Sequence, residues 1–184
     1  MIWSWFPAVA AAHLACVVAA SVSALRGRHA AAAKCVGVSV AVLGLFVAGI
    51  WIEMERPPLR TYGETRLAYA LGLGILSLLA FRFLRQSWTL LYGGAMAGLF
   101  VALTWALPES HSRALMPALR SPWFVPHVTV YLLGYAAATA TSIAALLNLR
   151  KPVTDGRKLD ALLSVTTVLL SFGLLFGALW AKGA

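Results

Sequence analysis

The stretch CVGVSVAVLGLFVAGIWI, Cys35–Ile52, contains no charged residue and decides the class of fold. A helix of about 20 apolar residues crosses the hydrocarbon core of a bilayer, and this run approaches that length. Similar uncharged runs precede and follow it along the chain. The complete set is Ile2–Leu25, Cys35–Ile52, Leu67–Phe81, Trp88–Leu107, Val128–Leu149 and Ala161–Ala181. We therefore predict about six transmembrane helices.

These runs must be helices, because backbone that faces lipid has to satisfy its own hydrogen bonds and continuous runs of this length are not barrel strands. The third run is short unless Arg66 and Arg82 snorkel from its ends. The first run is too long for a removable signal peptide and lacks its basic leader. Glycines such as Gly93, Gly134 and Gly177 are expected to serve only close helix packing. We expect one all-α transmembrane domain over residues 1–184.

The composition agrees with a membrane protein and excludes a water-soluble domain. Hydrophobic residues make up 61% of the chain and charged residues 11%, and the mean hydropathy is +0.82. Soluble domains are nearer half apolar and a quarter charged. The net charge of +9 comes from short clusters between apolar runs, with no basic face carrying interleaved aromatic residues. The sequence therefore predicts the lipid bilayer as a partner and no nucleic acid.

The distribution of Lys and Arg predicts the orientation in the membrane. Cytoplasmic loops carry an excess of these residues. The loops after the first, third and fifth runs hold nine of them, and the opposite side holds six. We expect the N-terminus and the segments 53–66 and 108–126 to lie on the outer side. His127 is then at the outer membrane surface.

Several classes of chemistry lack their usual signatures. All six acidic residues lie in loops or at helix ends, so no span carries the carboxylate that coupled transporters commonly use. There is no Gly-rich phosphate loop and no HExxH motif. Cys16 and Cys35 stand apart without a CxxC or CxxCH context. We read both as buried thiols and expect no covalently attached haem on this chain.

Four histidines remain as candidate ligands. His29 belongs to a basic cluster and is read as a solvated loop residue. His13 lies halfway along the first run, where it either contacts a cofactor or bonds a neighbouring helix. His111 is either a hydrated loop residue or a second axial ligand. His127 follows Pro126 at the start of a run. A clamp of His13 and His127 on one iron is disfavoured, because His13 lies roughly 16 Å below the outer face.

Two stretches resemble one known family. In ALMPALRSPWFVPHVTVYLLGYA, Ala114–Ala136, a Leu-Arg-Ser-Pro-Trp run precedes a histidine that opens a helix. This resembles CcsA-type cytochrome c biogenesis proteins, also called ResC, in which the run reads Leu-Gln-Ser-x-Trp. Arg120 stands where the family has glutamine. The stretch ERPPLRTYGETRLAYALGL, Glu55–Leu73, looks like the outer loop and following helix of the same family.

The resemblance implies that the protein binds haem b non-covalently in transit. Family members belong to the System II cytochrome c synthase, a haem lyase system. There CcsA and a CcsB/ResB-like subunit attach haem to apocytochrome c on the outer face of the bacterial inner membrane. By this analogy His127 is an axial ligand of the haem iron.

Neutral imidazole is a standard haem ligand. Trp123 either stacks on the porphyrin or anchors the helix at the interface, which is the role expected of Phe124. Arg120 and the outer residues Arg56, Arg60 and Arg113 either pair with haem propionates or are solvated.

The chain also departs from the family pattern. Members continue past FGALWAKGA, Phe176–Ala184, into a Trp-rich haem-binding segment and further helices with two more histidines. We therefore expect this sequence to be the N-terminal portion of a longer protein that does not complete haem attachment alone. The alternative is a non-catalytic structural or scaffolding membrane subunit in which His127 only caps a helix.

Overall fold

The computed structural model describes residues 2–107, 121–150 and 154–183, and these residues are almost entirely helical. A short 3₁₀ helix, η1 (Ile2–Trp5), leads into α1 (Phe6–Leu25). The remaining helices are α2 (His29–Met54), α3 (Tyr62–Leu84), α4 (Trp88–Ala106), α5 (Phe124–Arg150) and α6 (Gly156–Gly183). The described ranges contain six helices that are long and apolar enough to cross a membrane. The predicted all-α polytopic membrane fold is thus confirmed.

Several helices extend beyond the uncharged runs from which they were predicted. The second begins at His29 rather than Cys35, the third at Tyr62 rather than Leu67, and the fifth at Phe124 rather than Val128. The uncharged core of a span marks only the part expected in hydrocarbon. Polar residues at its ends can continue the helix into the interface.

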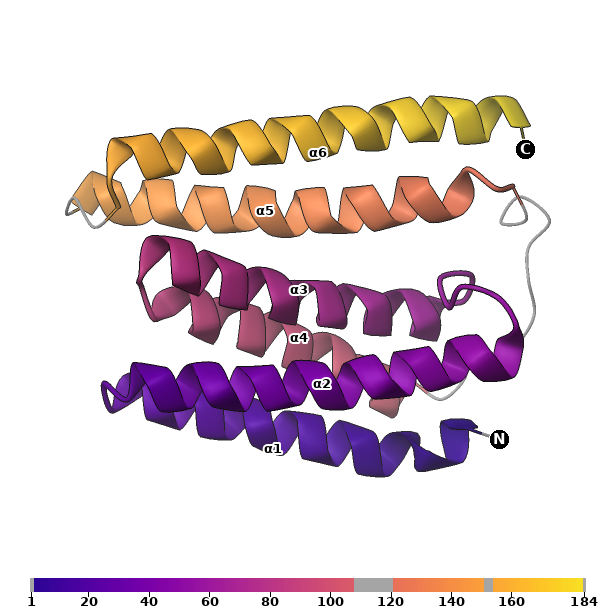
Figure 1. Cartoon of the computed structure of the whole chain (residues 1–184), viewed down its shortest axis with the longest axis horizontal. Helices are drawn as coiled ribbons and strands as arrows, with labels where there is room; N and C mark the ends of the chain where they lie inside the picture. Colours follow the sequence, from indigo (N-terminus) through magenta and orange to yellow (C-terminus); the bar gives the residue numbers. More distant parts are fainter. Residues whose placement is uncertain (1, 108–120, 151–153, 184) are drawn as a thin grey trace. The chain divides into compact units, whose positions relative to one another are not determined.

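The contacts along the chain divide it into two compact units, Met1–Leu115 and Met116–Ala184. In the N-terminal unit, α1 packs against α2 and α4, and α3 packs against the same two helices. In the C-terminal unit, α5 and α6 form an antiparallel pair (Figure 1). That the two units form a single domain stays a prediction.

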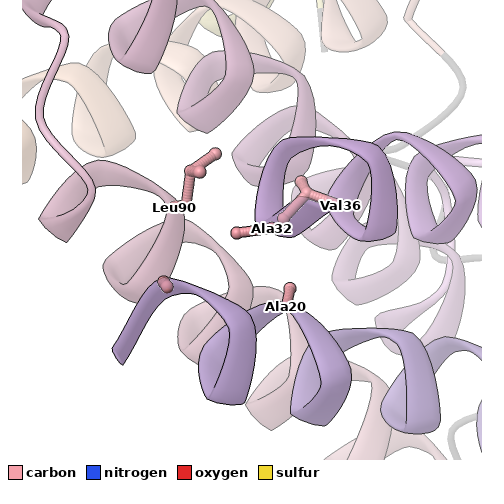
Figure 2. Close-up of a cluster of buried hydrophobic side chains, with 5 residues drawn as sticks. Ala20, Ala32, Val36 and Leu90 are labelled. Carbon is pink, nitrogen blue, oxygen red and sulfur yellow. The ribbon is translucent and has the colours of Figure 1, made fainter. Parts of the chain in front are cut away.

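Small side chains let the helices of the N-terminal unit approach one another. A buried cluster joins α1, α2 and α4, and Figure 2 shows its side chains pointing into the space between these helices. A Cβ atom added at Gly93 of α4 would clash with the Cβ atom of Ser77 on α3. Membrane helices associate largely through such close packing, because lipid provides no hydrophobic drive between them. The cluster consists of Ala20, Ala24, Ala32, Val36 and Leu90.

Candidate functional site

His127 lies in the first turn of α5. The turn at Ser121–Trp123 leads into the helix, and the backbone amide of His127 donates to the carbonyl oxygen of Trp123 at 3.1 Å. Pro126 has no amide hydrogen, which is tolerated in a first turn because the amides there have no partner within the helix. The sequence thus begins the helix just before the histidine and places the imidazole near one end of the span.

The imidazole of His127 is oriented by α6. Its Nδ1 atom lies 2.9 Å from the carbonyl oxygen of Gly173. A carbonyl oxygen can only accept a hydrogen bond, so Nδ1 must carry the proton and donate. In the neutral ring, Nε2 is then the unprotonated nitrogen with a lone pair. Among the described residues, Nε2 has no hydrogen-bond partner.

Aromatic rings and a glycine enclose the same imidazole. The ring of Trp180 stacks on it with centroids 5.5 Å apart and planes 17° apart. Tyr131, one turn along α5, meets it edge to face at 4.8 Å. A Cβ atom at Gly177 would lie 2.7 Å from Cε1 of His127, so the ring occupies space that any other residue would fill. The half-buried imidazole is therefore held in position and orientation before any ligand binds.

The aromatic residues before His127 also pack onto α6. Trp123, with 40% of its surface exposed, stacks on Phe176 with ring centroids 6.1 Å apart. Phe124 is buried, and its ring centroid lies 5.9 Å from that of Trp180. The side chain of Phe124 thus packs within the C-terminal unit, and its expected anchoring in the membrane interface stays a prediction. Trp123 keeps an exposed surface, so its predicted contact with a porphyrin stays open.

Two predicted site residues, His111 and Arg120, lie outside the described residues, as does Arg113. Their roles stay predictions. Within the described part, no three His, Cys, Asp or Glu side chains gather closely enough to hold a metal ion. A haem iron takes four bonds from its porphyrin, so a single histidine can serve as its ligand on one face.

His13 is buried between α1 and α2, with 1% of its surface exposed. Its Nδ1 atom lies 2.8 Å from the hydroxyl oxygen of Ser39 and 3.5 Å from the carbonyl oxygen of the same residue. Its Nε2 atom is buried without a hydrogen-bond partner in the described part of the chain. Of the two readings of His13, the bond to a neighbouring helix is the one that the contacts provide. A cofactor contact stays a prediction.

His29 also has a partner, although it is exposed. Its Nδ1 atom lies 2.7 Å from the hydroxyl oxygen of Ser87, which precedes α4. The prediction of a solvated loop residue is therefore incomplete, because the ring links the start of α2 to the start of α4.

An ion pair between Arg56 and Glu64 was not expected from the sequence. The guanidinium of Arg56 donates to both carboxylate oxygens of Glu64, at 2.8 and 2.9 Å. The carboxylate has 1% of its side-chain surface exposed and the guanidinium 17%. Glu64 also closes a capping box with Thr61 at the start of α3. The spacing Thr61-x-x-Glu64 is the sequence signal for such a cap and would have placed the helix start.

Comparison with known proteins finds a matching family model. A family model described as "Cytochrome C assembly protein" matches residues 61–184, which is more than half of the chain. This range begins at the capping threonine of α3 and includes His127 and all described residues of α5 and α6. No solved structure matches the chain significantly.

Curated relatives carry the name "Cytochrome c biogenesis protein CcsA". One from Synechococcus sp. (strain JA-3-3Ab) is 34% identical over 114 residues, covering 60% of this chain and 33% of the relative. One from Picosynechococcus sp. (strain ATCC 27264 / PCC 7002 / PR-6) is 31% identical over 130 residues, covering 67% of this chain and 38% of the relative. The chain spans about a third of the length of these relatives.

Proposed function

Because this chain belongs to the cytochrome c assembly protein family, we propose that it binds haem through His127 for attachment to apocytochrome c. The family match bears out the resemblance seen in Ala114–Ala136 and Glu55–Leu73 and supports a role in cytochrome c biogenesis. The haem ligand, the side of the membrane and the partners are our proposal.

One observation carries the proposal, which is the hydrogen bond from Nδ1 of His127 to the carbonyl oxygen of Gly173. Histidines that bind metals commonly donate their other ring nitrogen to such an acceptor, which fixes the tautomer and raises the basicity of the ligating nitrogen. In His127 this bond leaves Nε2 unprotonated.

Neighbouring residues are proposed to hold the porphyrin rather than the iron. Trp123 offers exposed aromatic surface, and Arg120 is proposed to pair with a propionate through its forked guanidinium. His111 is the weaker candidate for a further contact. A cofactor contact of His13, which belongs to the N-terminal unit, is a separate prediction. Bound in this way, haem b would supply the vinyl groups that cytochrome c maturation consumes.

The proposed setting is the bacterial inner membrane with the His127 end on the outer side. A CcsB/ResB-like subunit and apocytochrome c are the proposed partners. Haem binding is the proposed activity that can be measured directly. A scaffolding role is the alternative.

The proposal is tested by adding reduced haem to the purified wild-type protein in detergent and recording its absorption spectrum. Coordination by an imidazole shifts and sharpens the Soret band relative to haem in detergent alone. An unchanged haem spectrum would leave only the scaffolding alternative.

Alanine at Gly177 is expected to weaken haem binding. The added Cβ atom would lie 2.7 Å from Cε1 and 2.9 Å from Nδ1 of His127, so the ring must move away from the Gly173 carbonyl. Loss of the hydrogen-bond partner of a ligating histidine typically costs roughly 10- to 100-fold in metal affinity. A haem titration followed at the Soret band measures the change. The matched control is Gly156→Ala on the same helix, where a Cβ atom meets nothing within 4 Å. Equal haem affinity in both variants would contradict this orientation of the ring.

A cysteine at position 122 is expected to react with a membrane-impermeant maleimide added to intact cells. Pro122 is exposed, whereas its neighbour Ser121 is buried and unsuitable for labelling. The native Cys16 and Cys35 are half-buried free thiols, rather than fully buried ones as expected, and are first replaced by alanine. A cysteine at Arg28, which is exposed in a predicted cytoplasmic loop, should react only after the cells are opened. The reverse pattern would refute the proposed orientation.

A further inference from the structure

Two arginines at the start of α3 have guanidinium nitrogens that are buried without a partner. They are Nε of Arg60, in the segment between α2 and α3, and Nη1 of Arg66, in the second turn of α3. Neither side chain forms a hydrogen bond or ion pair within the ranges that the structure describes. Both residues are half-buried, so water does not fully replace the missing partner.

The acidic residues nearby do not neutralise these two charges. Glu64 is engaged by the guanidinium of Arg56 and by the backbone amides of Arg60 and Thr61. Glu53 accepts a hydrogen bond from the amide of Ile2 at 2.6 Å. Glu55 is exposed. No ion pair joins any of these carboxylates to Arg60 or Arg66 in the described part of the chain.

The hydroxyl of Thr65 ties the chain next to Arg60 to the chain next to Arg66. The hydroxyl of Thr65 donates to the carbonyl oxygen of Leu59 at 3.1 Å and is also 2.9 Å from the carbonyl oxygen of Thr61. Arg60 follows Leu59 directly, and Arg66 follows Thr65. The segment before α3 is thus folded back onto the first turns of that helix, with one unpaired arginine on each side of the contact.

A buried guanidinium donor without an acceptor is costly, and arginine is suited to bind planar or tetrahedral oxyanions through its forked donors. The site also joins the ends of two spans, where the polar groups of lipids lie. We propose that Arg60 and Arg66 form a binding site for the phosphate of an anionic phospholipid.

The test of this site uses lipid alone. Wild-type protein is placed in phosphatidylcholine nanodiscs with increasing fractions of phosphatidylglycerol, and its thermal unfolding midpoint is recorded. We expect a saturable rise in the midpoint. Arg60→Gln and Arg66→Gln should need on the order of tenfold more phosphatidylglycerol for the same rise, because each loses a charge-assisted contact. Arg82→Gln removes an exposed charge from the other end of α3 and should behave as wild type.

The inference is overturned if phosphatidylglycerol does not affect the unfolding midpoint of the wild-type protein, a result that does not depend on the folding of any variant. It is also overturned if the three glutamine variants respond alike. If Arg60→Gln does not fold, Arg60→Lys takes its place, because lysine keeps the positive charge but lacks the forked donors of arginine. A wild-type response to phosphatidylglycerol in both Arg60→Lys and Arg66→Gln would overturn the inference.

Discussion

Replacing His127 with alanine is expected to abolish the Soret shift produced by haem. The structure offers one pre-oriented imidazole nitrogen in the described part of the C-terminal unit, and the variant removes it. The loss in haem affinity should exceed roughly 10- to 100-fold, which is the typical cost of removing only the hydrogen-bond partner of a metal ligand. Titration of the purified variant with reduced haem, followed by absorption, measures it.

Added imidazole provides the check on folding. The space vacated by the ring is walled by Trp180 and Tyr131, and its hydrogen-bond acceptor is a backbone oxygen that the variant retains. Free imidazole is therefore expected to restore the Soret shift in His127→Ala at millimolar concentration, below the concentrations needed by haem in detergent without protein. A variant that had merely unfolded would not differ from that protein-free control.

His29→Ala is the matched control, because it removes an exposed imidazole whose partner is Ser87 in the N-terminal unit. It should bind haem as wild type does. If His127→Ala also binds haem normally and only its thermal stability falls, the scaffolding alternative is the better account. His13→Ala then becomes the informative variant, because that ring has a buried nitrogen without a described partner.

The helices could be predicted from uncharged runs, because the cost of placing charge in hydrocarbon is large and local in sequence. Helix ends could not be placed in this way. The start of α3 depends on the reciprocal bonds of Thr61 and Glu64, which a search for uncharged residues passes over. The spacing of these two residues is visible in the sequence, so the start of α3 could have been predicted from it.

The candidate site shows a sharper limit of sequence reasoning. His127 could be singled out as a polar residue at the start of a run, but the acceptor that orients it lies 46 residues further along the chain. Gly177 was predicted to serve packing alone, yet its missing side chain makes room for the histidine ring. Both facts depend on which face of α6 meets α5. The weak periodicity of uniformly apolar helices does not determine that face.

The ion pair of Arg56 and Glu64 is expected to dominate the stability of the N-terminal unit near the start of α3. Glu64→Ala leaves the guanidinium of Arg56 largely buried without its counter-ion and removes the acceptor of the Arg60 and Thr61 amides. Breaking one side of a buried pair typically costs about 3–5 kcal/mol. We expect a loss of unfolding free energy in this range, measured by denaturant titration of the protein in detergent micelles.

The double variant Arg56→Met/Glu64→Leu separates the ion pair from the other roles of the carboxylate. Replacing both charges by apolar residues removes the unpaired charge, so part of the lost stability should return. The stability that the double variant does not regain measures the helix cap. A leucine side chain cannot accept hydrogen bonds from the Arg60 and Thr61 amides as the carboxylate of Glu64 does. Glu55→Gln removes an exposed charge in the same segment and should change the stability little. If Glu64→Ala proves no more destabilising than Glu55→Gln, the pair is not formed in the membrane protein as the structure describes it.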